Sequence, residues 1–136
     1  MTDALVDRMR RAVAAEMSAV ESALLAVSGG IDSMVLLDAV LATRPASTFR
    51  VATFDHASGP HSALAVDLVE RIALGAGASV IIGRSMSVGR PSEASWRDSR
   101  LAFLRAAAAE HRATLYTAHT GDDQIETTVE RREPIA

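Results

Sequence analysis

Short apolar runs alternate along this chain with longer stretches in which apolar residues recur every three or four positions. Short runs bounded by turn-forming residues are typical of buried strands, and the longer periodic stretches are typical of amphipathic helices. The expected strands are residues 23–27, 49–55, 79–86 and 114–119. The expected helices are residues 3–21, 34–43, 61–77, 93–111 and 122–132, the third closed by C-terminal glycines and the fourth capped by Ser92.

The alternation of strands and helices predicts the fold class α/β, with a doubly wound parallel sheet of about four strands and helices on both faces. No repeat or long linker divides the sequence, so residues 1–136 are expected to form a single domain. Ligands of such sheets bind outside the carboxyl ends of the strands. The loops expected at this edge are rich in polar residues and comprise 28–33, 55–61 and 119–126. The sequence therefore predicts a ligand site there.

Composition limits the chemistry that the chain can perform. There is no cysteine among the 136 residues, which excludes disulfides, thiolate metal sites and cysteine nucleophiles. All 14 basic residues are arginine, so a Walker-type lysine and a Schiff-base lysine are excluded as well. The net charge of −3 argues against a strongly basic nucleic-acid surface. No apolar run approaches the ~20 residues of a membrane span, and a cytoplasmic location is expected.

The segment Ser-Gly-Gly-Ile-Asp-Ser, residues 28–33, joins the first expected strand to the next helix. Glycines at such a junction let the backbone approach an anion closely, and the N–H groups of the first helical turn point at that anion. Ser28 and Ser33 add hydroxyl donors. The segment fits neither the GxxxxGK[ST] phosphate loop nor the GxGxxG dinucleotide turn. It predicts a phosphate-binding loop of another kind.

Asp32 stands out in this loop, because a carboxylate beside phosphates repels them unless a divalent cation lies between. It therefore indicates bound Mg²⁺, or it is a simple cap of the helix that begins near Gly30. Asp122 and Glu126 form a second acidic feature, a like-charged pair four residues apart. They either lie near a cation or a substrate ammonium group, or form a solvated first turn that the helix dipole favours.

Four segments resemble motifs of a known superfamily. "SGGIDS" matches the Ser-Gly-Gly-x-Asp-Ser signature of the PP-loop ATP pyrophosphatases. "TFDHASGPHS", "SEASWRDSR" and "YTAHTGDDQIETT" resemble, in this order, motifs of the tRNA-Ile lysidine synthetases, and the likeness to their N-terminal catalytic domain covers roughly residues 22–130. The chain departs from these motifs at Thr120, where the family has a second histidine, and at Gly59, where it has an arginine. The sulfur-inserting relatives generally rely on cysteines, which this chain lacks.

The resemblance implies a ligase that uses ATP and Mg²⁺ to adenylate a cytidine of tRNA, which lysine then attacks with release of AMP. The residues expected to bind ATP are Ser28, Gly29, Gly30, Ile31, Asp32, Ser33 and Asp55. The expected metal ligands are Asp32 and Asp122, with Asp123 and Glu126 as alternatives to Asp122. The expected catalytic residues are Asp32, Arg97, His119, Asp123 and Glu126.

The expected roles of several further residues follow from their residue type and position. Arg97 is expected to clamp a phosphate or the tRNA backbone, whereas Arg100 is expected to be an ordinary exposed residue of the same helix. His56 ends a strand at the ligand edge, and an isolated histidine there is more often structural than catalytic. No chemistry is assigned to His61 and His111. Trp96 is expected to pack in the fold.

Two other functions remain open: a shortened PP-loop module that binds ATP or AMP without completing a transfer, and a different PP-loop ligase acting on a small molecule. In the family a fifth strand follows the fourth, and this sequence is expected to be truncated before it. Residues 114–118 would then form a free sheet edge without proline or charge. Such an edge predicts self-association into a homodimer through strand pairing or exchange.

Overall fold

A computed structural model describes residues 3–57, 59–85, 93–120 and 127–132. In this part of the chain, one mixed sheet has the strand order β3-β2-β1-β4-β5. The strands are β1 (Ala23–Ala26), β2 (Phe49–Asp55), β3 (Ser79–Arg84), β4 (Thr114–Thr120) and β5 (Thr127–Arg132). The helices are α1 (Asp3–Met17), α2 (Ile31–Thr43), α3 (Pro60–Gly75) and α4 (Glu93–Glu110), with a short 3₁₀ turn η1 (Ala46–Thr48) before β2.

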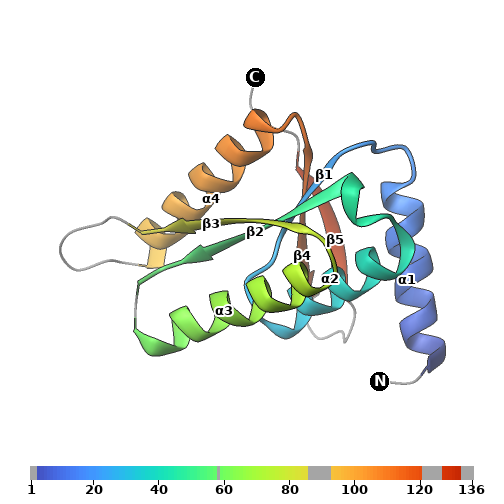
Figure 1. Ribbon diagram of the computed structural model, residues 1–136, viewed down its shortest axis with the longest axis horizontal. Helices are drawn as coiled ribbons and strands as arrows, with labels where there is room; N and C mark the ends of the chain where they lie inside the picture. The colour runs from blue at the N-terminus through green and yellow to red at the C-terminus, as the bar shows by residue number, and fades with distance from the viewer. Residues whose placement is uncertain (1–2, 58, 86–92, 121–126, 133–136) are drawn as a thin grey trace.

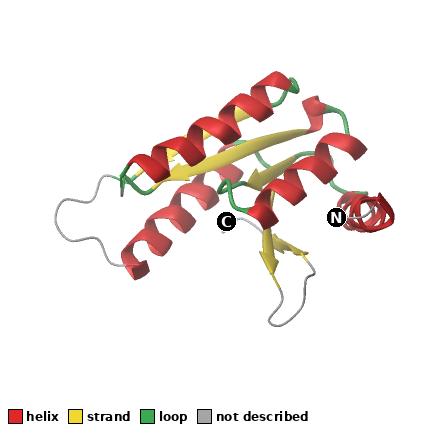
Figure 2. Ribbon diagram, turned by 90° about the horizontal axis from the view of Figure 1, so that it is seen from below, coloured by secondary structure: helices red, strands yellow, loops and turns green. Residues whose placement is uncertain are grey.

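The first four strands run parallel, which confirms the predicted doubly wound α/β fold. Figures 1 and 2 show the sheet between α4 on one side and α2 and α3 on the other, with α1 beside α2. From β1 the chain moves outward through β2 to β3, and then α4 returns it to β4 on the other side of β1. The direction of winding therefore reverses between β1 and β4. That is the position at which folds of this kind hold their ligands.

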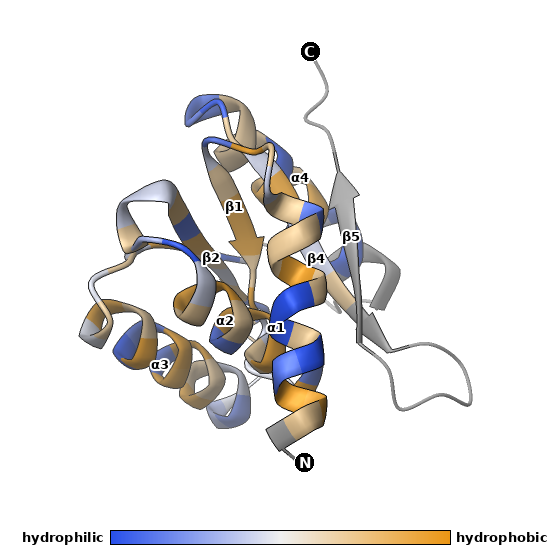
Figure 3. Ribbon diagram, turned by 90° about the vertical axis from the view of Figure 1, so that its right-hand side faces the viewer, coloured by the Kyte–Doolittle hydropathy of each residue, from blue (hydrophilic) through white to orange (hydrophobic). Residues whose placement is uncertain are grey.

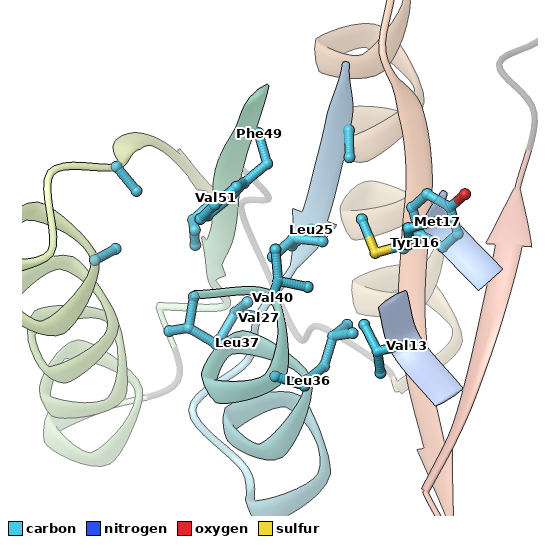
Figure 4. Packing of buried hydrophobic residues seen from close by; sticks show 14 of the residues in the cluster. Val13, Met17, Leu25, Val27, Leu36, Leu37, Val40, Phe49, Val51 and Tyr116 are labelled. Carbon is cyan, nitrogen blue, oxygen red and sulfur yellow. The ribbon is translucent and has the colours of Figure 1, made fainter. Parts of the chain in front are cut away.

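Both faces of β1 are buried, because its side chains alternate between two apolar clusters. Leu25 and Val27 pack in the larger cluster with residues of α1, α2 and α3. Leu24 packs in the smaller cluster with Leu104 and neighbouring alanines of α4. Figure 4 shows the larger cluster, in which Val13 of α1 and the leucines and valine of α2 lie against the sheet. A strand that is apolar on both faces fixes the depth of the loop that follows it.

Two sequence predictions about the C-terminal segment are wrong. Residues 122–132 were expected to be a helix, but Thr127–Arg132 form β5, which pairs antiparallel with β4. Its threonines and valine are β-branched residues, which favour extended backbone. The pairing joins Leu115 to Arg132 and Thr120 to Thr127, so residues 114–118 are not a free edge. The reason given for a homodimer, strand pairing at β4, therefore does not apply.

The other elements lie close to their predicted positions. The helix expected at 34–43 begins three residues earlier, at Ile31, because the end of the glycine loop already has helical backbone. The expected glycine C-cap of α3 is present at Gly77, whose φ is +87°. Ala78 N–H donates to the Ala73 carbonyl at 3.0 Å, which satisfies an otherwise unpaired group of the helix end. Among the described residues, no helix is both long and apolar enough to cross a membrane.

Candidate functional site

A cavity of about 370 Å³ opens at the carboxyl ends of β1, β2 and β4. Its lining comes from strand ends, from the loop after β1, and from the first turns of α3 and one face of α4. The lining includes Ser28, Ser33, Phe54, His56, His61, Ser62, Ala65, Arg100 and Thr117. The cavity lies where the sequence predicted a site, since the carboxyl ends of parallel strands meet at one edge of the sheet.

Two serine hydroxyls hold the loop after β1 in shape. The Ser33 hydroxyl donates to the Gly30 carbonyl at 3.0 Å and accepts the Ser28 N–H at 3.1 Å. The Ser28 hydroxyl accepts the Gly30 N–H at 3.2 Å and lies 3.2 Å from the Ser33 hydroxyl. Both serines line the cavity. The loop is therefore closed on itself, and its hydroxyls are available to exchange partners with a bound anion.

Gly29 allows this loop to pack against α3. Its φ is +91°, a conformation that residues with a side chain rarely adopt. A Cβ atom at this position would lie 3.1 Å from the Cβ of Ala65. Backbone conformation and close packing thus both require glycine. The loop and the start of α3 consequently form one wall of the cavity.

The N-terminus of α2 faces the same region. Gly30 occupies the N-cap position, without a side-chain cap bond, and the first intrahelical bond runs from Met34 N–H to the Gly30 carbonyl. The N–H groups of Ile31, Asp32 and Ser33 precede that bond in the first turn of the helix. Asp32 lies in the first turn of this helix, two residues after the N-cap. Anions are stabilised at such a helix end.

The side chain of Ile31 lies on the other side of the loop. It is 82% exposed and lines a second hollow, between α1 and α2, together with Met9 and Met34. An Arg10–Asp38 ion pair at 3.3 Å borders that hollow. Ile31 therefore does not line the main cavity.

The sheet side of the main cavity is apolar. Ala26, Ala52 and Phe54 line it, with Leu104 of α4 opposite. The Phe54 ring lies 5.3 Å from the His56 ring in an edge-to-face arrangement, measured between centroids. An apolar hollow beside a polar loop suits a ligand that carries a flat ring and an anionic group.

Asp55 lies beside the cavity and organises the turn after β2. Its carboxylate accepts the Ala57 N–H at 2.8 Å and a short hydrogen bond from the Ser62 hydroxyl. The Nε of Arg84 lies 3.8 Å from the other carboxylate oxygen. These hydrogen bonds lower the pKa of Asp55, the bond from Ser62 contributing most, while burial opposes the shift. Asp55 thus fixes the start of α3, and Ser62 connects it to the cavity wall.

His56 is half-buried in the cavity lining. Burial lowers its pKa below the ordinary 6.5, the positive charge of Arg100 lowers it further, and the Asp55 carboxylate opposes both. The imidazole is consequently neutral near pH 7. A neutral ring beside Phe54 can stack on a ligand or accept a proton from one.

Arg97 and Arg100, two of the arginines of α4, have different surroundings. Arg100 is half-buried and lines the cavity, whereas Arg97 is exposed and does not line it. Sequence reasoning treated Arg100 as an ordinary surface residue, and the three-residue spacing gave no means of distinguishing the two. It also left out His61 and Ser62, although both follow Pro60 at the start of a helix on the ligand edge. That position is the signal that could have identified them.

Part of the predicted site lies outside the described residues. These positions are Asp122, Asp123 and Glu126. His119 belongs to β4, whose preceding residues Thr117 and Ala118 line the cavity. Among the described residues, no group of three or more acidic or histidine side chains gathers as a metal site. The possible metal ligands near the loop are all oxygens, namely the Asp32 carboxylate and two serine hydroxyls. Mg²⁺ needs only one or two carboxylates from the protein when phosphates supply other ligands.

Comparison with known proteins gives a family match over nearly the whole chain. The family model described as "PP-loop domain" matches residues 2–133. Three curated relatives are each called tRNA(Ile)-lysidine synthase. Those from Streptomyces coelicolor and Methylobacterium nodulans are 38% and 36% identical over 76% and 79% of this chain, which is 31% and 32% of their length. That from Mycolicibacterium paratuberculosis is 35% identical over 90% of this chain and 38% of its own.

Solved structures share the fold at much lower identity. The glutamine-dependent NAD⁺ synthetase of Acinetobacter baumannii, in complex with ADP, superimposes with a TM-score of 0.59 at 19% identity, covering 82% of this chain and 23% of that one. The NH₃-dependent NAD synthetase of Campylobacter jejuni gives 0.61 at 14% identity, covering 85% and 56%. The curated relatives match with about a third of their length, so this chain corresponds to one part of them.

Proposed function

We propose, since this chain belongs to the PP-loop family, that the cavity binds ATP and that the chain is the ATP-using domain of a ligase of the tRNA(Ile)-lysidine synthase type. One observation carries the proposal. The loop of residues 28–33 places two serine hydroxyls and the N-terminus of a helix at the mouth of a cavity with an apolar wall. Polar and apolar parts of one nucleotide match these two parts of the cavity.

The phosphates belong at the loop. Gly29 lets the backbone come close to them, and the N–H groups of Ile31 to Ser33 offer donors toward negative charge. Ser28 and Ser33 would exchange their mutual contact for bonds to phosphate oxygens. The leaving pyrophosphate gains charge during cleavage between the α- and β-phosphates, and fixed donors stabilise that charge.

The adenosine belongs in the apolar part. Phe54 supplies a ring edge and His56 a neutral ring, while Ala26 and Ala52 leave space beside them. Among the described residues that line the cavity, the arginine is Arg100. It would bind the α-phosphate, a role that suits a planar guanidinium with several donors.

Asp32 would hold Mg²⁺ together with the phosphates, and Asp122 or its acidic neighbours would complete the set. When bound, Mg²⁺ supplies positive charge that neutralises the phosphates. Asp32 sits one residue into α2, next to the loop that would hold them. Asp32→Asn should therefore weaken ATP binding in Mg²⁺ and change it much less in EDTA. Equal losses in both conditions would assign Asp32 a structural role.

The chemistry that we propose for the transfer is the one that the resemblance to the lysidine synthetases implies. The C2 oxygen of a tRNA cytidine would attack the α-phosphate and release pyrophosphate, after which the amine of lysine would attack C2 and release AMP. Arg97, exposed one turn from Arg100, would contact the tRNA backbone. His119, Asp123 and Glu126 would act on the reacting groups. The chain spans about a third of the length of this relative. We therefore extend the complete transfer to this chain only as a proposal.

The test is to incubate the chain with ATP and Mg²⁺ and to identify the products with and without tRNA-Ile and lysine. AMP and pyrophosphate that depend on tRNA support the ligase. ATP binding without any AMP would favour the nucleotide-binding module, and AMP formed without tRNA would favour a ligase acting on a small molecule. ADP as the sole product would refute cleavage between the α- and β-phosphates.

A further inference from the structure

The outer face of α3 has an apolar ridge that the described part of the chain leaves uncovered. Leu64, Leu68 and Ile72 are 64%, 38% and 38% exposed. Their four-residue spacing places them in one row along the helix. The opposite face, with Val69 and Ala73, is fully buried against the sheet. The ridge is therefore a second apolar surface of the same helix, separate from the core.

A charged row runs beside this ridge. Asp67 and Arg71 are exposed, lie four residues apart, and carry opposite charges. Neither belongs to the ion pairs found among the described residues. Each copy of α3 thus presents one acidic and one basic side chain at the border of its apolar row.

This arrangement is complementary to itself. Residues 67 and 71 lie equally far on either side of residue 69, so a two-fold axis at that level in an antiparallel pair of helices places Asp67 opposite Arg71 of the second copy, twice. The same axis sets the apolar row of one copy against that of the other, with Leu68 nearest the axis. Apolar ridges of two helices interlock in such crossings. A parallel pair would instead place like charges side by side.

We propose that α3 is the interface of a homodimer, formed by an antiparallel, two-fold contact of its outer faces. Figures 1 and 3 show α3 at the border of the helical layer, beyond α2. None of the five side chains named for this contact lines the cavity, so the interface leaves the cavity open. The contact is isologous and therefore closes at two copies. It differs from strand pairing at β4, which β5 prevents.

Sedimentation velocity of the full chain over a wide concentration range tests the proposal. The wild-type chain should pass from monomer to dimer with no larger species. Asp67→Arg and Arg71→Asp should each raise the dimer dissociation constant at least about tenfold, since each places like charges together. The double variant should return it to within about threefold of wild type. Glu16→Arg, the same type of change on an exposed position of α1, is the matched control and should have no effect.

Leu68→Asp tests the apolar part and should abolish the dimer, with Leu68→Ser as a milder variant if the first does not fold. Circular dichroism and thermal melting establish folding in each case. A chain that stays monomeric at all concentrations would overturn the proposal. So would a dimer that both single charge reversals leave intact, or growth beyond two copies.

Discussion

Ser33 sets the shape of the loop after β1 because one hydroxyl serves both of its ends. It accepts an N–H from Ser28 and donates to the carbonyl of Gly30, which together close a turn around the glycines. A second hydroxyl, that of Ser28, returns to Gly30 N–H. Hydroxyls can rotate and change between donating and accepting. The loop can therefore hold its form when empty and reorganise its bonds around phosphate oxygens without moving its backbone far.

Gly29→Ala should reduce both stability and ATP affinity. The φ of +91° costs a residue with a Cβ about 1–2 kcal/mol, and the new methyl group would press on Ala65 at 3.1 Å. We expect ATP affinity to fall at least about tenfold, because the loop must shift away from the phosphates. Gly30→Ala is the comparison, since its φ of −73° suits any residue. Urea unfolding and calorimetric titration with ATP measure the two effects. Equal stability of the two variants would contradict the argument.

Ser62→Ala should make the free energy of unfolding depend less on pH in the acidic range. The pKa of Asp55 is lowered on folding, so its contribution is present above the unfolded value of 3.8 and is lost as the pH falls through the lower folded value. Removing the Ser62 hydroxyl removes the largest cause of this lowering and moves the folded pKa back toward 3.8.

The variant should thus be less stable than wild type at pH 7, and the difference should shrink as the pH approaches 3. Urea unfolding across that pH range measures it, and Ser62→Thr, which keeps a hydroxyl, is the control. A difference that does not change with pH would mean that Ser62 acts through packing alone.

Individual residues were predictable from the sequence where backbone chemistry decides their role. The glycines and serines of the loop could be identified because few other residues permit that turn. Arg100 could not be identified, because Arg97 and Arg100 fit an exposed face of α4 equally well. The packing of α4 against the sheet decides which one reaches the cavity, and this packing involves Leu104 together with residues of other elements.

At the scale of elements, α4 places Arg100 in the cavity lining and leaves Arg97 exposed, so we expect these two arginines to bind different partners. Arg100→Ala should weaken ATP binding at least about tenfold, because it removes a charged donor from the cavity. Arg97→Ala, on an exposed turn of the same helix, should change ATP affinity less than about twofold. It should instead lower the affinity for tRNA. Titrations with ATP and with tRNA distinguish these roles, and an ATP defect in Arg97→Ala as large as in Arg100→Ala would contradict them.

The end of α3 offers a matched pair of glycines. Gly77 has a φ of +87° in the turn that closes the helix, so Gly77→Ala should destabilise the fold by about 1 kcal/mol. Gly75 lies in the last turn of the helix, and a Cβ there would meet open space, so Gly75→Ala should stabilise it by about 0.5–1 kcal/mol. Denaturant unfolding of both variants measures the signs. A destabilised Gly75→Ala together with an unaffected Gly77→Ala would contradict the cap.

The sequence predicted elements well where hydrophobic period and end signals agreed. The first four strands and the helices between them follow this rule, including the glycine that ends α3. The prediction failed at β5, where the acidic residues among 122–126 suggested the first turn of a helix and the β-branched residues at 127–129 suggested a strand. Local pattern could not decide between the two, because the unpaired edge of β4 supplies the partner for the strand.

At the scale of the whole molecule, the reversal of winding between β1 and β4 makes the site. Because β1 and β4 are neighbours in the sheet, the loop of residues 28–33 lies beside the end of β4. Residues far apart in the sequence therefore share one cavity. The same topology would leave β4 as the border of the sheet if β5 were missing. The fifth strand therefore protects the edge nearest the site, and its sequence TTVERR ends in charged residues that discourage further pairing.

Removing β5 should consequently expose β4 and change how the protein associates. A chain ending at Glu126 loses the pairing of Thr127–Arg132 with residues 115–120, which leaves a strand without proline and without acidic or basic side chains in residues 114–118. We expect lower stability to urea and concentration-dependent growth beyond a dimer. A chain ending at Arg132 keeps the strand and should behave as wild type. Light scattering after size exclusion measures the species. If the shorter chain shows no additional association, β4 must be protected by some other part of the fold.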